Sequence, residues 1–324
     1  MYATAEGTAR YVQSHPDYLT AGFYRTVFDL KVSTLGIGTY LDASVEALLE
    51  AGQTGINFFD TAINYRNQQS ERDIGRAIER LQRDEIVVCT KAGFLTPGAL
   101  PASLTADDVV GGMHSMAPHF LEDQIDRSRA NMGVDTLDVF YLHNPETQLG
   151  FRTRDDFETR IRRAFARLEK LADQQKIRRY GVATWEGFRK TEALSLPRLA
   201  QIAREEGGDD HRFRFIQLPF NLGMVEAFVG RPENVLTAAG GLGIAVVASA
   251  TLMQTQVLEH MPDAVRDLLP GLETNAQRAI QFTRSTPGIA VALVGMARPE
   301  HVRENLGVAQ SPPVSPEEYL RLYR

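Results

Sequence analysis

Four side chains capable of acid–base chemistry follow three consecutive apolar segments of the sequence. Asp60 comes directly after Ile56–Phe59, Tyr65 lies in the loop behind it, and Lys91 and His143 follow the next two apolar runs. A phenol has an ordinary pKa of ~10, too high for efficient proton transfer near neutrality, but a neighbouring ammonium group favours the phenolate. Asp60 would neutralise a buried lysine, and His143 could hydrogen-bond a substrate oxygen. Together they predict a proton relay for a carbonyl that becomes an alcohol, and since such a relay needs a hydride source, a nicotinamide cofactor is implied.

Each of these four residues also has an ordinary structural explanation. An aspartate after a strand is often a turn residue, a loop tyrosine a packing residue, a strand-end lysine a surface charge and a lone histidine a structural one. Neighbouring strands, however, lie ~4.8 Å apart, and the carboxyl ends of parallel strands meet at one edge of a sheet. We therefore expect the four side chains to meet in one site.

The elements that must position these residues alternate between strand and helix patterns. Eight short apolar segments are predicted as strands with both faces covered: Thr34–Thr39, Gly55–Phe59, Glu85–Thr90, Leu137–Leu142, Arg179–Ala183, Arg214–Leu218, Ile244–Ala248 and Ile289–Val294. Between them lie amphipathic helix patterns, most clearly where Phe157, Ile161, Phe165 and Leu168 share one face. Eight such units predict an α/β fold, a (β/α)8 TIM barrel forming a single domain over residues 1–324. A doubly wound sheet is the alternative, but "LGIGTYLDAS" lacks its G-x-G-x-x-G phosphate turn.

Three segments fall outside this alternation. Before the first barrel strand, "AGFYRTVFDLKVS" predicts a short hairpin with a turn near Asp29, plugging the base of the barrel. Long loops, residues 93–118 and 143–156, follow the third and fourth strands at the C-terminal face, where barrel enzymes keep their sites. The first of these loops is expected to form an apolar lid, with a plain flexible insertion as the alternative; its apolar residues are Phe94, Leu95, Leu100, Met113 and Met116.

Composition narrows the class of partner. The content of 43% hydrophobic and 23% charged residues is that of an ordinary soluble globular protein, and the net charge of −6 argues against nucleic acid or an anionic membrane as a partner. The longest nearly apolar run, residues 240–253, is shorter than the ~20 residues that cross a bilayer, and the first 20 residues do not resemble a signal peptide. The single cysteine, Cys89, lies in a predicted strand as core packing, and the seven histidines form no H-x-H or H-E-x-x-H pair. We expect a cytoplasmic protein that binds no metal, and the sequence carries no signal of its oligomeric state.

Several motifs, in their order and spacing, resemble the aldo-keto reductase superfamily. They are "LGIGTY", "GINFFDTAINYRNQQSERDIGRAI", "TKAG", "FYLHNPE", "YGVATW", "QLPFNL" and "TPGIAVALVGMARPEHVRENL". The resemblance covers roughly residues 30–308. It implies a (β/α)8 barrel that interconverts carbonyls and alcohols with NAD(P)H. The catalytic tetrad of that family matches Asp60, Tyr65, Lys91 and His143.

The resemblance also implies a cofactor site, with departures from the family pattern. Gly38, Thr39 and Asp60 would lie near the nicotinamide, and Thr184 and Gln217 would hold its carboxamide, although the usual Ser-Asn pair is here Ala183-Thr184. The aromatic residue expected to stack on the nicotinamide is Phe220. The pyrophosphate segment lacks the glycines typical of the family, and its expected contacts are Ser249, Thr251 and Leu252.

The end of the chain is expected to bind the adenosine part of the cofactor. Glu304 and Asn305 match the residues that the family uses on adenine, whereas an arginine common in the family is replaced by His301. Arg298 or Arg303 could instead bind a 2′-phosphate, since arginine binds phosphate in a bidentate manner. We expect NADPH as the cofactor, with NADH as the alternative.

The expected substrate is a small carbonyl or alcohol that contacts Tyr65, His143, Trp185 and Phe94. Two other classes of function are compatible with a barrel. One is a cofactor-binding sensor or regulatory subunit, as the potassium-channel β subunits of the same superfamily are. The other is a metal-dependent hydrolase, which the missing histidine pairs disfavour.

Overall fold

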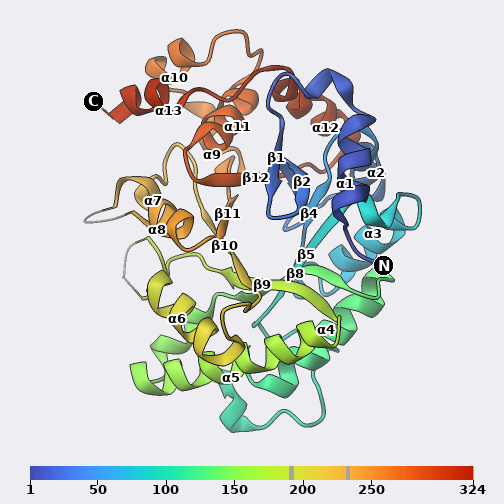
Figure 1. The fold of residues 1–324 in the computed structure, drawn as a ribbon, viewed down its shortest axis with the longest axis vertical. Coiled ribbons are helices and arrows are strands. Elements are labelled where there is room, and N and C mark those ends of the chain that lie inside the picture. Colours follow the sequence, from blue (N-terminus) through green and yellow to red (C-terminus); the bar gives the residue numbers. More distant parts are fainter. Residues whose placement is uncertain (190–192, 231–233, 324) are drawn as a thin grey trace.

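The eight predicted strands close into a parallel barrel in the computed structural model, which describes residues 1–189, 193–230 and 234–323 (Figure 1). Each barrel strand pairs with the next one along the chain, and the last pairs with the first. The strands are β3 (Leu35–Gly38), β4 (Phe58–Asp60), β5 (Val87–Ala92), β8 (Leu137–His143), β9 (Ile177–Ala183), β10 (Phe213–Pro219), β11 (Ala245–Ser249) and β12 (Ile289–Gly295). The predicted (β/α)8 barrel is confirmed. The second strand begins later than predicted and ends on Asp60, which was expected to follow it.

A helix follows each barrel strand and packs on the outside of the barrel (Figure 1). These helices are α2 (Val45–Thr54), α3 (Gln69–Ile78), α4 (Pro118–Met132), α5 (Arg154–Asp173), α6 (Leu196–Gly207), α8 (Val235–Gly241), α11 (Asn275–Ser285) and α12 (Pro299–Asn305). The predicted stripe of α5 is buried, and the Thr153 hydroxyl caps the helix by accepting a hydrogen bond from the amide of Asp156 at 3.2 Å.

Shorter elements connect or extend this frame. They are the helices α1 (Ala5–Gln13), α7 (Glu226–Val229), α9 (Gln256–Glu259), α10 (Asp263–Leu268) and α13 (Pro316–Tyr319), and the 3-10 helices η1 (Pro16–Tyr18), η2 (Arg83–Glu85), η3 (Ala106–Asp108), η4 (Pro145–Gly150), η5 (Met253–Thr255), η6 (Leu306–Gln310) and η7 (Leu320–Tyr323). Tyr319 is buried, and its hydroxyl lies 2.7 Å from that of Thr286, so the C-terminal segment folds back onto α11. Within the described ranges, no helix is both long and apolar enough to cross a membrane.

The predicted N-terminal hairpin consists of β1 (Tyr24–Val27) and β2 (Leu30–Ser33), which pair antiparallel. Its residues Val27, Leu30 and Val32 belong to the same buried cluster as the side chains that fill the barrel. The hairpin therefore closes the base of the barrel, and the opposite mouth is left for a site.

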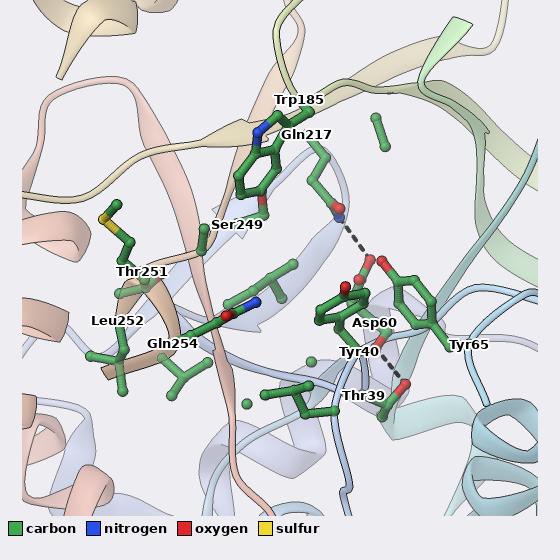
Figure 2. A pocket seen from close by; sticks show the side chains of 18 of the residues that line it. Thr39, Tyr40, Asp60, Tyr65, Trp185, Gln217, Ser249, Thr251, Leu252 and Gln254 are labelled. Carbon is green, nitrogen blue, oxygen red and sulfur yellow. Dashed lines mark hydrogen bonds between the residues drawn. The ribbon is translucent and has the colours of Figure 1, made fainter. Parts of the chain in front are cut away.

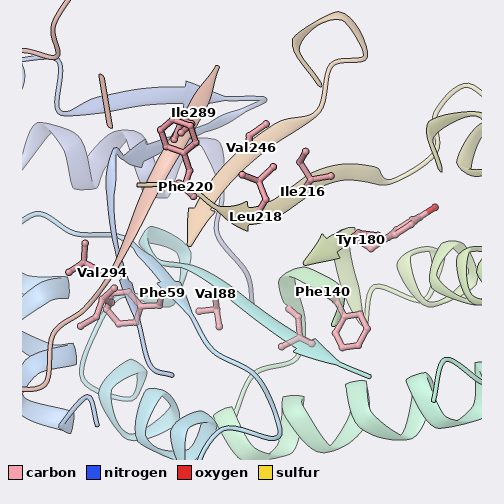
Figure 3. Close-up of a cluster of buried hydrophobic side chains, with 14 of the residues drawn as sticks. Phe59, Val88, Phe140, Tyr180, Ile216, Leu218, Phe220, Val246, Ile289 and Val294 are labelled. Atoms are coloured by element: carbon pink, nitrogen blue, oxygen red, sulfur yellow. The ribbon is translucent and has the colours of Figure 1, made fainter. Parts of the chain in front are cut away.

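Side-chain alternation along the strands separates two layers of core. Figure 3 shows the outer layer, in which Phe59, Val88, Phe140 and Ile216 belong to the cluster between strands and helices. The residues next to them in sequence form the inner cluster, which includes Phe58, Cys89, Tyr141 and Phe215.

This alternation decides where the polar strand ends point. Asp60, Lys91, His143 and Gln217 each lie two residues beyond an inner-cluster residue, so their side chains face the interior of the barrel at its C-terminal mouth. Thr90, on the opposite face of β5, instead donates to the Glu71 carboxylate of α3 at 2.7 Å.

Candidate active site

The ends of β4, β5 and β10 are joined by a buried ion pair. The Nζ atom of Lys91 donates to the Oδ1 atom of Asp60 at 2.5 Å and to the carbonyl oxygen of Thr61 at 2.6 Å. The other carboxylate oxygen of Asp60 accepts a hydrogen bond from the Gln217 amide at 2.7 Å. Both charged side chains are almost fully buried. The strand ends thus fix a single positive charge beneath the mouth of the barrel.

Tyr65 reaches this charge from the loop after β4. The Nζ atom of Lys91 lies 5.1 Å from the centroid of the Tyr65 ring. The turn behind the tyrosine is unusual, because Arg66, Asn67 and Gln68 all have positive φ angles (49°, 52° and 72°), which non-glycine residues adopt at a cost. Asp73 of α3 holds the turn by accepting a hydrogen bond from Arg66 at 2.8 Å.

Burial and charge act in opposite directions on the groups of this cluster. Burial raises the pKa of the Tyr65 hydroxyl above its ordinary value, and the positive charge of Lys91 partly opposes that rise. Burial would lower the pKa of Lys91, but the charges of Asp60 and Tyr65 outweigh it and raise the pKa, so the lysine stays protonated. Burial likewise raises the pKa of Asp60, against the charge and hydrogen bond of Lys91.

His143 completes the group from the end of β8. Its ring lies edge-on to the rings of Tyr65 and Phe94, with centroids 5.8 Å and 5.2 Å apart. Burial, followed by the charge of Lys91, lowers the pKa of His143 well below its ordinary value. The imidazole is therefore neutral, and it can donate one hydrogen bond into the mouth of the barrel. All four side chains of the sequence-predicted relay are brought together.

A cavity of about 680 Å³ opens above this group (Figure 2). The residues that line it include Asp60, Tyr65, His143, Trp185 and Phe94. Its size is within the range of ~300–1,000 Å³ that is typical of small-molecule sites. The other predicted residues that line it are Gly38, Thr39, Thr184, Gln217, Ser249, Thr251 and Leu252.

Two polar residues of the cavity, Thr184 and Gln217, differ in how much of their hydrogen-bonding capacity is still available to a ligand. The Thr184 hydroxyl donates to the Glu146 carboxylate at 2.6 Å and accepts from the amide of Gly187 at 2.7 Å, so its contacts are already made. Gln217 donates to Asp60 through its nitrogen, which leaves its amide oxygen as an acceptor. A carboxamide contact is therefore available at Gln217 and is not expected from the Thr184 hydroxyl.

Phe220, which was predicted to stack on the nicotinamide, does not reach the cavity in this structure. The side chain is fully buried, does not line the cavity, and stacks on Phe282 of α11 with ring centroids 6.1 Å apart. Figure 3 shows Phe220 among the outer-layer side chains. The residue lies just beyond β10 and packs against α11. The sequence pattern could not predict this contact, because α11 is remote from Phe220 in the sequence.

The residues predicted to bind adenosine do not line this cavity. Arg298 precedes α12, and His301, Glu304 and Asn305 lie on it. The Arg298 guanidinium lies 3.4 Å from the Nε2 atom of His301 at the surface. Glu304 is exposed, whereas Asn305 is buried.

The expectation of an apolar lid over the site is also corrected. Of the five apolar residues of loop 93–118, Phe94 lines the cavity and the other four do not. The loop has structure of its own, since it contains η3 and an antiparallel pair, β6 (Val109–Val110) and β7 (His114–Ser115). Met116 is buried beneath it, and Met113 is exposed.

Several lining residues were missed by the sequence reasoning. Tyr40 follows Thr39 at the end of β3, and its ring lies edge-on to that of Tyr65 at 5.1 Å. Tyr40 could have been predicted from its sequence position, because residues at the ends of barrel strands form the site. Asn64 and Gln254 also line the cavity, and Figure 2 shows Gln254 extending toward the side where Tyr40 lies. No sequence signal marks Gln254, which sits in η5 with a positive φ of 51°.

The cavity has open space and polar atoms that lack partners among the described residues. A Cβ atom placed on Gly38 would come no closer than 3.9 Å to another residue, so the space beside this strand end is open. Among the described residues, no hydrogen-bond partner exists for the buried Thr251 hydroxyl or for the Nδ1 atom of His143. The residues that the structure describes contain no cluster of side chains that could bind a metal ion.

Comparison with known proteins gives consistent matches. The Aldo/keto reductase family model matches residues 34–266. D-threo-aldose 1-dehydrogenase from Pseudomonas sp is 26% identical over 289 residues, covering 82% of this chain and 82% of that protein. NADH-specific methylglyoxal reductase from Escherichia coli (strain K12) is 28% identical over 170 residues, covering 48% of this chain and 49% of that protein. A solved aldo/keto reductase from Klebsiella pneumoniae, in complex with NADP and acetate, shares the fold with a TM-score of 0.66 at 22% identity, covering 92% of this chain and 94% of that one.

Proposed function

The chain belongs to the aldo-keto reductase family, and from this premise we propose that it interconverts a carbonyl compound and an alcohol with NAD(P)H, Tyr65 serving as the general acid or base. The observation that carries the proposal is the buried Lys91–Asp60 pair beneath Tyr65, at a cavity that His143 also lines. When bound, the nicotinamide cofactor supplies or accepts the hydride.

The residues of the chain account for the accompanying proton. In the direction of reduction, Tyr65 gives its hydroxyl proton to the substrate oxygen, and the positive charge of Lys91 stabilises the phenolate left behind. Asp60 keeps Lys91 charged by accepting its hydrogen bond at Oδ1, and Gln217 holds the carboxylate in place through Oδ2. The neutral His143 donates a hydrogen bond that holds the substrate oxygen against the phenol. In the direction of oxidation, the same atoms take the proton back.

Gln217 and the strand ends fit the nicotinamide end of the cofactor. The amide oxygen of Gln217 can accept a hydrogen bond from the carboxamide, and the strand end at Gly38 leaves open space in the same cavity. Ser249 and the Thr251 hydroxyl, which has no partner within the described ranges, are available to the pyrophosphate. These contacts are common to NADPH and NADH.

The choice between the two cofactors depends on the 2′-phosphate. Arg303 is engaged by Glu50 and Glu300, each at 3.0 Å, whereas Arg298 contacts the ring of His301. Of these two arginines, Arg298 is therefore the one without a carboxylate partner among the described residues, and we propose NADPH as the cofactor. The alternative is NADH, which the name of the Escherichia coli relative specifies for that protein.

The substrate is proposed to be a carbonyl compound with hydrophobic bulk. Phe94, Tyr40, Trp185 and Met224 give the cavity a largely apolar wall. Asn64 adds an amide beside Tyr65 whose oxygen has no hydrogen-bond partner among the described residues. A hydroxyl group near the reacting carbonyl could donate a hydrogen bond to this amide oxygen.

The proposal is tested by following the absorbance of reduced nicotinamide with a panel of aldehydes and ketones, and of oxidised nicotinamide with the matching alcohols. Turnover in the wild type that is lost in Tyr65→Phe is expected. A protein that binds NADPH tightly but turns over none of the panel would instead be a cofactor-binding sensor, the alternative within this superfamily. Turnover that needs an added metal and leaves the nicotinamide unchanged would contradict both.

A further inference from the structure

His114 lies in the loop between β5 and α4, is fully buried, and is not among the residues that line the cavity. Both nitrogens of its ring have partners. The Nε2 atom lies 2.7 Å from the carbonyl oxygen of His143, and the Nδ1 atom lies 2.9 Å from the side-chain nitrogen of Gln148. Gln148, in η4 of the following loop, is also fully buried. Two loops that are remote in sequence are therefore joined behind the catalytic histidine.

The hydrogen bonds fix a single tautomer of His114. A carbonyl oxygen can only accept, so the Nε2 atom must carry the proton and donate it to His143. Burial lowers the pKa of His114 to about 4, which keeps the ring neutral near neutrality. The Nδ1 atom of a neutral ring is then an acceptor, and the Gln148 amide donates to it.

The carbonyl group of His143 needs this partner because the barrel sheet ends beside it. β8 ends at His143, and Asn144 turns away with a φ of 49°. On the neighbouring side, β5 ends at Ala92, and the carbonyl of Gly93 accepts from the amide of Ser115 at 2.8 Å. The His114 ring replaces a strand partner, so the carbonyl does not remain buried and unpaired.

Close packing makes the arrangement specific. A Cβ atom on Gly93 would lie 2.4 Å from the carbonyl oxygen of His143 and 2.6 Å from the Nε2 atom of His114, so glycine is required there. The ring of Phe94 lies edge-on to both histidines, with centroids 5.3 Å and 5.2 Å away. The His143 ring has no hydrogen bond at Nδ1 within the described ranges, so packing and the main chain hold it.

We propose that His114, held in place by Gln148, is a positioning residue that fixes the end of β8 and thereby aims the His143 imidazole at the substrate oxygen beside Tyr65. The inference rests on the proposed function, in which His143 binds that oxygen. A displacement of ~1 Å in a group that orients substrate can cost up to ~100-fold in rate. The effect of losing His114 is therefore expected in the reaction with the carbonyl and not in cofactor binding.

Two substitutions, His114→Asn and His114→Gln, test whether a donor at the position of Nε2 is what matters, since both introduce a polar amide but only one places its nitrogen there. The side-chain nitrogen of glutamine can take the place of Nε2, whereas the shorter asparagine reaches only as far as Nδ1. We expect His114→Asn to lower kcat/KM for the carbonyl about tenfold to 100-fold and His114→Gln to restore most of the loss. The dissociation constant for NADPH should stay within about twofold in both variants, since neither contact involves the cofactor residues.

Gln124→Leu is the matched control. Gln124 is fully buried on α4 and donates to the carbonyl of Ala99 at 2.6 Å, so it braces the same loop without touching His143. The control should lose thermal stability as the His114 variants do, but keep the wild-type kcat/KM. An equal loss of kcat/KM in Gln124→Leu and His114→Asn would overturn the proposal, because a general loosening of the loop would then explain both.

Nuclear magnetic resonance of the isotope-labelled imidazole nitrogens tests the same inference without turnover. His114 should show a neutral ring protonated at Nε2, and the His143 signals should shift in His114→Asn but not in His114→Gln or Gln124→Leu. If the His114 variants do not fold, Gln148→Leu is used, which removes the hydrogen bond to Nδ1 that holds the ring and should shift the His143 signals. Unshifted His143 signals contradict the inference even in an active enzyme. An inactive wild type with the expected shifts contradicts only the proposed function.

Discussion

The Nζ atom of Lys91 lies over the ring of Tyr65, 5.1 Å from its centroid. The phenol is buried, which raises its pKa, and the lysine is the positive charge that opposes this rise. The lysine in turn stays charged because Asp60 accepts its hydrogen bond at 2.5 Å. The proton affinity of Tyr65 thus depends on an ion pair between two strands, with Lys91 on β5 and Asp60 on β4.

Replacing Tyr65 by phenylalanine should abolish carbonyl reduction while the affinity for NADPH is retained. The change removes the proton donor and leaves the ring, and loss of a positioned acid or base costs about 100- to 10,000-fold. Steady-state turnover and a fluorescence titration of the cofactor measure the two effects.

Tyr141→Phe is the control for this substitution, because Tyr141 pairs with Lys91 in the sheet register but points deeper into the barrel. Its hydroxyl has no partner among the described residues, so activity should change little. Full activity in Tyr65→Phe would exclude the tyrosine as proton donor.

Replacing Lys91 by methionine should remove most activity and raise the pKa of Tyr65. Since the ammonium opposes the rise that burial causes, its loss moves that pKa further up. In the direction of alcohol oxidation, where phenolate is the base, the limb of the pH–rate profile should therefore move to higher pH. A pH profile that keeps its shape would argue against tuning by the lysine.

The same substitution leaves Asp60 buried without its cation, which typically costs ~3–5 kcal/mol of stability. The double variant Lys91→Met/Asp60→Asn removes the uncompensated charge and should recover much of this loss in urea unfolding, yet remain inactive. Recovery of activity in the double variant would show that the charge is not needed for chemistry.

Arg298→Ala should weaken the binding of NADPH about tenfold and hardly change the binding of NADH, because only NADPH carries the 2′-phosphate. Hydrogen bonds to a charged group contribute ~1.5–3 kcal/mol. Arg303→Ala is the comparison, since Arg303 is already engaged by Glu50 and Glu300. Dissociation constants for both cofactors and both variants provide the measurement. Equal weakening of NADPH and NADH by Arg298→Ala would show that this arginine does not contact the 2′-phosphate.

Asp73→Asn should destabilise the protein in a pH-dependent manner. Burial raises the pKa of Asp73, but hydrogen bonds from Gln69 and Arg76 and the charges of Arg76 and Arg66 outweigh it and lower the pKa below its ordinary value. A carboxylate with a lowered pKa stabilises the fold fully above the pKa of the unfolded chain, about 3.9, and loses this effect as the pH falls through the folded-state value.

The difference in unfolding free energy between wild type and Asp73→Asn should therefore be roughly 1–3 kcal/mol at neutral pH and shrink below about pH 4. Urea unfolding at several pH values measures it. Because Asp73 holds the positive-φ turn behind Tyr65, kcat should fall as well. A stability difference that does not change with pH would show that the ionised carboxylate is not what holds the turn.

The strand and helix pattern, and with it the barrel, could be predicted because those signals are local. Val88, Cys89, Thr90 and Lys91 alternate between the two faces of β5 whatever surrounds them, so the sequence sufficed to send Lys91 into the barrel. The prediction that four polar strand ends meet at one mouth follows from the geometry of parallel strands.

The partners of residues that lie outside the strands and helices could not be predicted in this way. Phe220 was expected at the cofactor and packs on Phe282, and Thr184 was expected to hold a carboxamide and is bound to Glu146. Neither partner is near in sequence, and a loop residue has no periodic pattern that assigns its face.

The amino-acid sequence by itself determined which elements form and which strand ends carry a phenol, an amine, a carboxylate and an imidazole. Only the tertiary structure decided how these groups are held, as in the bond from His114 to the main chain of His143. The physical reason is range: alternation along a strand is set by neighbouring residues, whereas the partner of a buried polar atom is set by whichever distant segment packs against it.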